Sequence, residues 1–142
     1  MTSGTTRAGL ALVHGELSHE IIGAFYDVYN ELGFGFPEGL YQRAMPVALA
    51  GRGLQCEREL LLVVRYKGEV VGSYRADLIV EGKITVECNV AIRILPVHEA
   101  QLLTYLKAGG IKVGMVLTFG PRPTFRRMLL LPPKEESAVI RS

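Results

Sequence analysis

The stretch that decides the fold is residues 74–90, which read YRADLIVEGKITVECNV. It holds the end of one segment rich in β-branched and aliphatic residues, Val70 to Val80, and the whole of another, Ile84 to Val90. Between them lies Glu81-Gly82-Lys83, a short polar segment with a central glycine. This arrangement is typical of two antiparallel strands joined by a tight turn, so the sequence predicts a β-hairpin here.

The register of this hairpin determines which side chains share a face. A three-residue loop pairs Val80 with Ile84 and places Asp77 directly opposite Glu87, with Asn89 on the same face. A two-residue loop would instead send Glu87 to the other face of the sheet. We expect the three-residue loop, because hairpin loops of this length that contain glycine are common.

Two opposed carboxylates need an explanation, because like charges at cross-strand distance destabilise a sheet. A hard divalent cation bound by the oxygens of Asp77 and Glu87 would compensate the repulsion. The alternative is structural: the two acids are solvated on an exposed face, or they pair with Arg75, Arg93 or Lys83. The hairpin alone leaves both interpretations open.

Two helices are predicted before the hairpin. The first follows an apolar spacing from Ser18, which we expect to be the N-cap, to Leu32. The second begins at Pro37, a position that suits a helix-starting proline, and has an apolar stripe that leads to Gly51. Pro46 lies inside this second helix, where proline removes a hydrogen bond, so we expect a kink or an early end there.

The remaining elements surround the hairpin. Their predicted order along the chain is α, α, β, β, β, α, β, β, which implies one mixed sheet with helices packed on it, an α+β or α/β layered domain. The helix that follows the hairpin can carry a parallel crossover. Besides the hairpin strands, the elements predicted are a strand over Leu60–Tyr66, a helix over Pro96–Lys107, and strands over Ile111–Phe119 and Phe125–Leu131.

Length and composition are those of one ordinary domain. The 142 residues can bury a substantial core without disulfides. We expect residues 1–16 to be a flexible arm, residues 17–131 to form the domain, and residues 132–142 to be a polar tail.

The charge balance permits nucleic acid as a partner but does not indicate it, since 16 basic and 14 acidic residues give a net charge of only +2. Cys56 and Cys88 form no CxxC motif, so we expect two buried thiols in a reducing cytoplasm; a disulfide is the alternative. No apolar run approaches the length of a membrane span, and we therefore expect a soluble protein without a membrane partner.

The helix predicted after the hairpin carries a polar stripe. His98, Gln101 and Tyr105 are spaced so that they share one helix face. Such a stripe is ordinary on an exposed surface, and it would also suit positioning a phosphate or a water beside the acidic hairpin. A lone histidine is more often structural than a ligand.

Four segments together resemble the GxxExxY proteins, a family placed within the PD-(D/E)XK nuclease superfamily. Residues 35–41, GFPEGLY, match the motif that names the family. Residues 74–80, YRADLIV, resemble its motif aspartate strand, and residues 86–89, VECN, its E-x-K strand. Residues 96–106, PVHEAQLLTYL, resemble the helix that follows. The resemblance covers about residues 17–131 and implies a restriction-endonuclease-like αβββαβ core.

This resemblance also implies an active site. By analogy with the family, one or two Mg²⁺ ions, or Mn²⁺, would be bound in this chain by Glu38, Asp77 and Glu87, with the backbone carbonyl of Cys88. The metal would polarise a scissile phosphate of DNA and lower the pKa of an attacking water. Gln101 and Tyr105, which match a Q-x-x-x-Y helix, would position the phosphate.

One motif position departs from the family pattern. Where the family has lysine, this chain has Asn89. Asparagine is shorter and uncharged, and removing one preorganised donor typically lowers a rate by about 10²- to 10³-fold. Arg75 shares the Asp77 face by strand alternation and is one cation that could take over the role of the lysine.

Three functions therefore compete at the level of sequence. The first is a metal-dependent DNA phosphodiesterase, possible even with Asn89. The second is a catalytically inactive relative that binds nucleic acid or a protein. The third is a self-associating module, a homo-oligomer that pairs through an exposed strand such as Phe125–Leu131.

Overall fold

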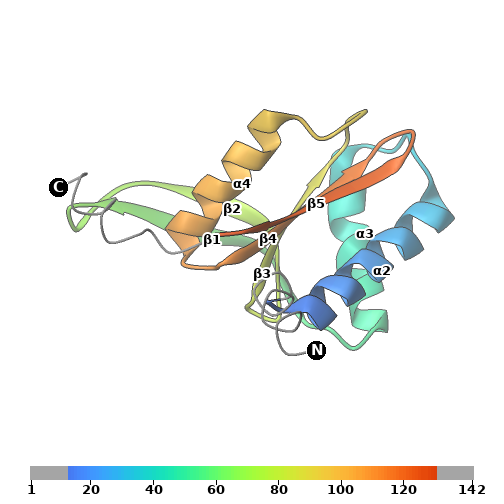
Figure 1. The fold of residues 1–142 in the computed structure, drawn as a ribbon, viewed down its shortest axis with the longest axis horizontal. Helices are drawn as coiled ribbons and strands as arrows, with labels where there is room; N and C mark the ends of the chain where they lie inside the picture. The colour runs from blue at the N-terminus through green and yellow to red at the C-terminus, as the bar shows by residue number, and fades with distance from the viewer. Residues whose placement is uncertain (1–12, 131–142) are drawn as a thin grey trace, which may run out of the picture.

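The computed structural model describes residues 13–130 as a five-stranded mixed sheet with helices on both faces (Figure 1). The expected α+β layered architecture is confirmed. The predicted arm and tail lie largely outside the described residues. The elements are α2 (Gly15–Leu32), α3 (Glu38–Gly51), β1 (Cys56–Tyr66), β2 (Glu69–Val80), β3 (Ile84–Asn89), α4 (Pro96–Gly109), β4 (Val113–Phe119) and β5 (Pro123–Leu129).

Strand order in the sheet follows the chain, β1-β2-β3-β4-β5. Neighbours are antiparallel except β3 and β4, which are parallel. Helix α4 connects these two strands, because parallel neighbours require a crossover rather than a tight turn. The predicted parallel crossover is therefore confirmed, and it brings α4 beside the acidic hairpin.

The helices cover opposite faces of the sheet. On β4, Leu117 belongs to the cluster formed with α2 and α3, whereas its neighbour Val116 packs against Leu102 and Leu106 of α4. Successive side chains of a strand point to opposite faces, so this division places α4 across the sheet from α2 and α3. Within residues 13–130, no helix is long and apolar enough to cross a membrane.

An aromatic group forms the centre of the larger core. Phe119, at the end of β4, is fully buried. Its ring stacks on Tyr41 of α3, with centroids 4.1 Å apart, and meets Phe25 of α2 edge to face at 4.9 Å. The Tyr41 hydroxyl donates to the carbonyl oxygen of Gly33 at 2.6 Å, which satisfies its one polar group. This group joins both N-terminal helices to the sheet.

Two helix expectations were wrong, the N-cap at Ser18 and an early end at Pro46, whereas the kink expected at Pro46 as the other outcome stays a prediction. Ser18 is not an N-cap: α2 begins at Gly15, and the buried Ser18 hydroxyl donates to the carbonyl oxygen of His14 at 2.9 Å. Helix α3 does not end early at Pro46 but continues to Gly51. Burial of the apolar face of α3 compensates the hydrogen bond that proline removes.

Among the strands, the predicted start of β1 differs most from the structure, because β1 begins at Cys56 rather than at Leu60. The two cysteines are free thiols, as expected rather than the disulfide alternative. Cys88 is buried, whereas Cys56 is only partly so.

The turn between β4 and β5 lies very close to the segment after β3. A Cβ atom added to Gly120 would lie 2.2 Å from the backbone carbonyl oxygen of Ala91. The Tyr29 hydroxyl also donates to the Gly120 carbonyl oxygen, at 2.6 Å. These contacts hold the segment after β3 against the turn between β4 and β5, and that turn against α2.

We expect Gly120→Ala to lower the free energy of unfolding by about 2 kcal/mol or more, because the obstacle is backbone and cannot rotate away. Urea denaturation would measure the change. Gly51→Ala is the matched control, since nothing lies within 4 Å of a Cβ at that helical position. Equal stability of the two variants would contradict the close approach.

Candidate active site

The acidic hairpin has the register predicted from its loop. Val80 pairs with Ile84 and Leu78 pairs with Val86, which confirms the three-residue loop. The regular pairing of β2 with β3 stops at Leu78 and Val86, and hydrogen bonds to the carboxylates of the two acids take its place. The backbone N–H of Asp77 donates to Glu87 Oε2 at 3.2 Å, and the N–H of Cys88 donates to Asp77 Oδ2 at 2.9 Å. Each carboxylate thus bonds the strand that carries the other.

Both acids are partly buried, and this disfavours their charged forms. Burial, followed by the charge of Asp77, raises the pKa of Glu87 to about 8. Burial is also the main cause that raises the pKa of Asp77, opposed by the hydrogen bond from the Cys88 N–H. The alternative of solvated acids on an exposed face is therefore wrong.

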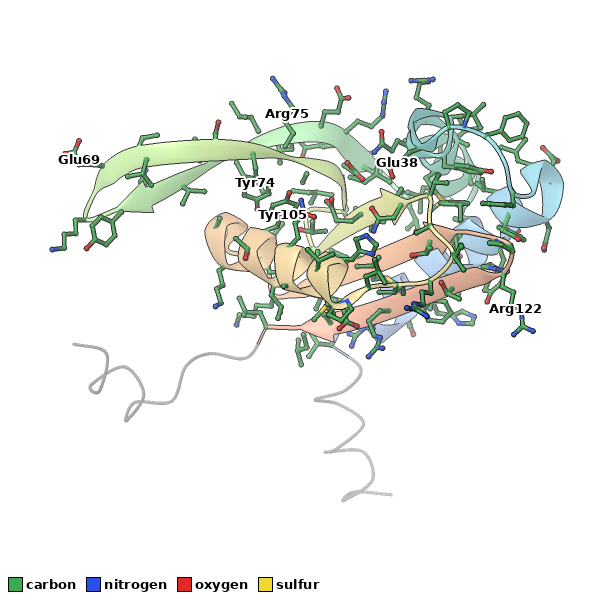
Figure 2. The ribbon with its side chains drawn as sticks, turned by 90° about the horizontal axis from the view of Figure 1, so that it is seen from above. Glu38, Glu69, Tyr74, Arg75, Tyr105 and Arg122 are labelled. Atoms are coloured by element: carbon green, nitrogen blue, oxygen red, sulfur yellow. The ribbon has the colours of Figure 1, made fainter. Side chains whose placement is uncertain are left out.

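Glu38 lies in the first turn of α3 and is labelled in Figure 2. Its Oε1 atom accepts the backbone N–H of Val90 at 3.1 Å, so it touches the chain directly after β3. Its charge contributes to raising the pKa values of both Asp77 and Glu87. Glu38 therefore lies near enough to Asp77 and Glu87 for its charge to act on both, while its own hydrogen bond is to the backbone after β3.

Gln42 is a site residue that the sequence reasoning missed. It lies one turn after Glu38 and donates from Nε2 to Glu38 Oε2 at 3.4 Å. A side-chain hydrogen bond from Gln42 also favours the charged form of Asp77, and it therefore opposes the rise in the pKa of Asp77 that burial causes. The sequence does contain a sign of this contact, because Gln42 follows Glu38 by four residues on a helix predicted to begin at Pro37, and residues so spaced are neighbours on one helix face.

Helix α4 presents the predicted amide and phenol. Gln101 Nε2 donates to the hydroxyl of Tyr105, so the two share one face as expected. His98 has a different position: its Nδ1 accepts the backbone N–H of Leu95 at 3.1 Å and caps the start of the helix. The structural interpretation of His98 is the one that the geometry supports.

Tyr74 of β2 is a second residue missed from the sequence. Its ring stacks on that of Tyr105, with centroids 3.9 Å apart and an angle of 14° between the planes (Figure 2). Its hydroxyl donates to the Tyr105 backbone carbonyl oxygen. Burial, followed by the charges of Glu87 and Tyr105, raises the pKa of Tyr74 to about 12, so this phenol stays protonated. Tyr74 connects α4 to the strand that carries Asp77.

Asn89 is the last residue of β3, two positions after Glu87 and therefore on the same face. In the parallel ladder it pairs with Thr118 of β4. Arg75, considered from the sequence as a replacement cation, donates to the Glu59 carbonyl oxygen at 3.3 Å.

The donor chemistry of the site fits a hard divalent cation. Carboxylate oxygens are the preferred ligands of such ions, and the charges of Asp77 and Glu38 add to the effect of burial in raising the pKa of Glu87, so a nearby positive charge would favour its ionised form. Over residues 13–130, however, no group of three or more His, Cys, Asp or Glu side chains is assembled as a metal site. In this conformation Glu38 and Asp77 instead accept backbone N–H groups.

A mixed sheet of this topology, with acids on its second and third strands, defines a restriction-endonuclease-like domain. Comparison with protein families matches residues 15–128 to the PD-(D/E)XK nuclease superfamily. The chain belongs to that superfamily.

A solved structure, the crystal structure of SSO0001, has a similar fold. The TM-score is 0.56 and the sequence identity 22%, over 73% of this chain. The match spans only 55% of that protein, so this chain corresponds to about half of its length. No curated protein matches the chain.

Proposed function

We propose that the protein is a metal-dependent phosphodiesterase of the GxxExxY type that acts on DNA, with activity reduced by Asn89. The observation that supports this most is the pair Asp77 and Glu87. The two carboxylates are partly buried, face each other and have raised pKa values, a costly arrangement that a bound cation would relieve.

Each acid has a role in this proposal. Glu38, Asp77 and Glu87, with the Cys88 carbonyl oxygen, would hold Mg²⁺ or Mn²⁺. Such an ion, when bound, polarises a phosphate oxygen and lowers the pKa of a coordinated water. Before binding, Glu87 keeps a proton near neutral pH that the ion must displace, so affinity should rise with pH.

The face of α4 would hold the substrate. Gln101 and Tyr105 are joined by a hydrogen bond, and Tyr74 fixes the ring of Tyr105 by stacking. A phenol and an amide held in this way can donate to phosphate oxygens without first losing side-chain freedom. Asn89 can also donate a hydrogen bond, but it brings no positive charge to the developing transition state.

The second candidate is a relative that binds nucleic acid or a protein without cleaving it. Asn89 is the observation that favours it, because the acids remain while the cation of the motif is missing. Such a binder would retain DNA affinity that falls with rising salt, since phosphate contacts release counterions.

The test compares wild type, Asn89→Lys and Asp77→Asn on single- and double-stranded DNA with Mg²⁺ and Mn²⁺. We expect slow cleavage by wild type, cleavage faster by about 10²-fold in Asn89→Lys, and none in Asp77→Asn. The asparagine at position 77 keeps an oxygen that can accept the Cys88 N–H, so the fold should survive.

Glu57→Gln, at an exposed β1 position, is the matched control and should cleave as wild type does. Absence of metal-dependent cleavage from both wild type and Asn89→Lys would overturn the proposed activity. Salt-dependent DNA binding in that case would support the second candidate.

A further inference from the structure

The free edge of the sheet formed by β1 is the feature that the proposed activity does not use. Among the described residues, β1 pairs with β2 alone, and the hairpin they form projects beyond the helices (Figures 1 and 2). Glu69 marks the projecting end of this hairpin in Figure 2. An edge strand presents unpaired backbone groups, which are a template for another strand.

The centre of β1 is entirely aliphatic. Residues 60–64 read LLLVV, and Leu61 and Val63 are 50% and 40% exposed. Backbone irregularities mark both ends of this segment: Glu59 has a φ of 52°, and the register with β2 shifts between Val64 and Arg65. Between them the edge carries neither a charge nor a proline.

The opposite edge of the sheet is different. Strand β5 begins at Pro123 and carries Arg126 and Arg127 near its middle. Proline and charged side chains are the usual means by which edge strands avoid pairing. The contrast favours the uncharged centre of β1 over β5 as the edge suited to a partner strand.

The charges that flank the aliphatic segment are self-complementary. When two β1 strands run antiparallel about a two-fold axis at Leu62, Leu61 faces Val63 of the second copy and Glu59 faces Arg65. An axis at Leu61 instead pairs Glu57 with Arg65 but places the charged Glu59 opposite the aliphatic Val63.

We propose that β1 pairs with β1 of a second copy of this chain, in antiparallel register centred on Leu62. The aliphatic side chains then cover one another, and an acid meets a base at each end of the shared strand pair. The two five-stranded sheets become one continuous sheet across the dimer. This assembly is independent of the proposed nuclease activity.

Charge reversal tests the register, with mass in solution as the readout. Sedimentation velocity of the full chain over a range of concentrations should show a dimer. Glu59→Arg and Arg65→Glu should each weaken dimerisation by about tenfold or more, because two repulsive contacts replace two attractive ones in every dimer. Circular dichroism would verify that each variant keeps its fold.

Two rescues make the test specific. The double variant E59R/R65E should restore the dimer, since each altered residue meets its altered partner. An equimolar mixture of the two single variants should also dimerise, because every facing pair is again opposite in charge. Arg122→Glu, in the turn before β5, is the control and should dimerise as wild type does.

Several results would overturn the proposal. A monomer at all concentrations would remove the assembly itself. A dimer insensitive to both single variants would assign association to another surface. Single variants that weaken the dimer without rescue in the double variant, or a dimer that forms only when DNA is added, would contradict the proposed strand pairing.

Discussion

In a chelated, metal-free buffer, the free energy of unfolding should fall as the pH rises from about 5 to about 8. The carboxyl of Glu87 has an ordinary pKa of 4.5, which applies in the unfolded chain, and a pKa of about 8 in the folded protein. Between these values the folded state holds more protons than the unfolded state, so raising the pH favours unfolding. The slope from this one group approaches about 1.4 kcal/mol per pH unit. Urea denaturation at several pH values would measure it.

The Glu87→Gln variant should remove most of this dependence, because glutamine does not titrate but still offers an oxygen to the Asp77 N–H. A smaller slope of the same sign should remain, since the pKa of Asp77 is also raised. Glu57→Gln, on exposed β1, should keep the wild-type slope. If the glutamine at position 87 left the slope unchanged, the acid pair would not be its source.

The second large effect is expected at Phe119. Its replacement by alanine should lower the free energy of unfolding by about 3 to 5 kcal/mol, because a fully buried ring that contacts Tyr41 and Phe25 would be lost. Chemical denaturation at pH 6 would measure the loss. Phe125→Ala, at a ring that is 39% exposed on β5, is the matched control and should cost clearly less. Equal losses would contradict the central position of Phe119.

The central hairpin could be predicted because the residues that determine its pairing lie close together in the sequence. Loop length sets the pairing of Val80 with Ile84, and the alternation of side chains then fixes the face of Asp77. The parallel pairing of β3 with β4 followed from the helix between them. The resemblance added Glu38, whose contact with the residue after Asn89 depends on how α3 packs against the sheet and cannot be counted along the chain.

Other features depended on tertiary packing and could not be predicted from local pattern. Ser18 has a typical capping side chain, yet the helix extends beyond it, and Pro46 lies within a continuous helix. The stacking of Tyr74 on Tyr105 joins residues thirty-one positions apart, on a strand and a helix. No periodicity in either element indicates that contact. The superfamily is established, whereas membership of the GxxExxY proteins stays a prediction.

The hydrogen bonds between the acidic strands bear on how this site evolves. Asp77 and Glu87 each accept a backbone N–H from the opposite strand, at the point where regular pairing of β2 and β3 stops. Loss of either acid would leave a partly buried N–H unsatisfied, a cost to folding that does not depend on any reaction. Selection on stability alone would therefore preserve a hydrogen-bond acceptor at both positions, although an amide oxygen would serve there as well as a carboxylate.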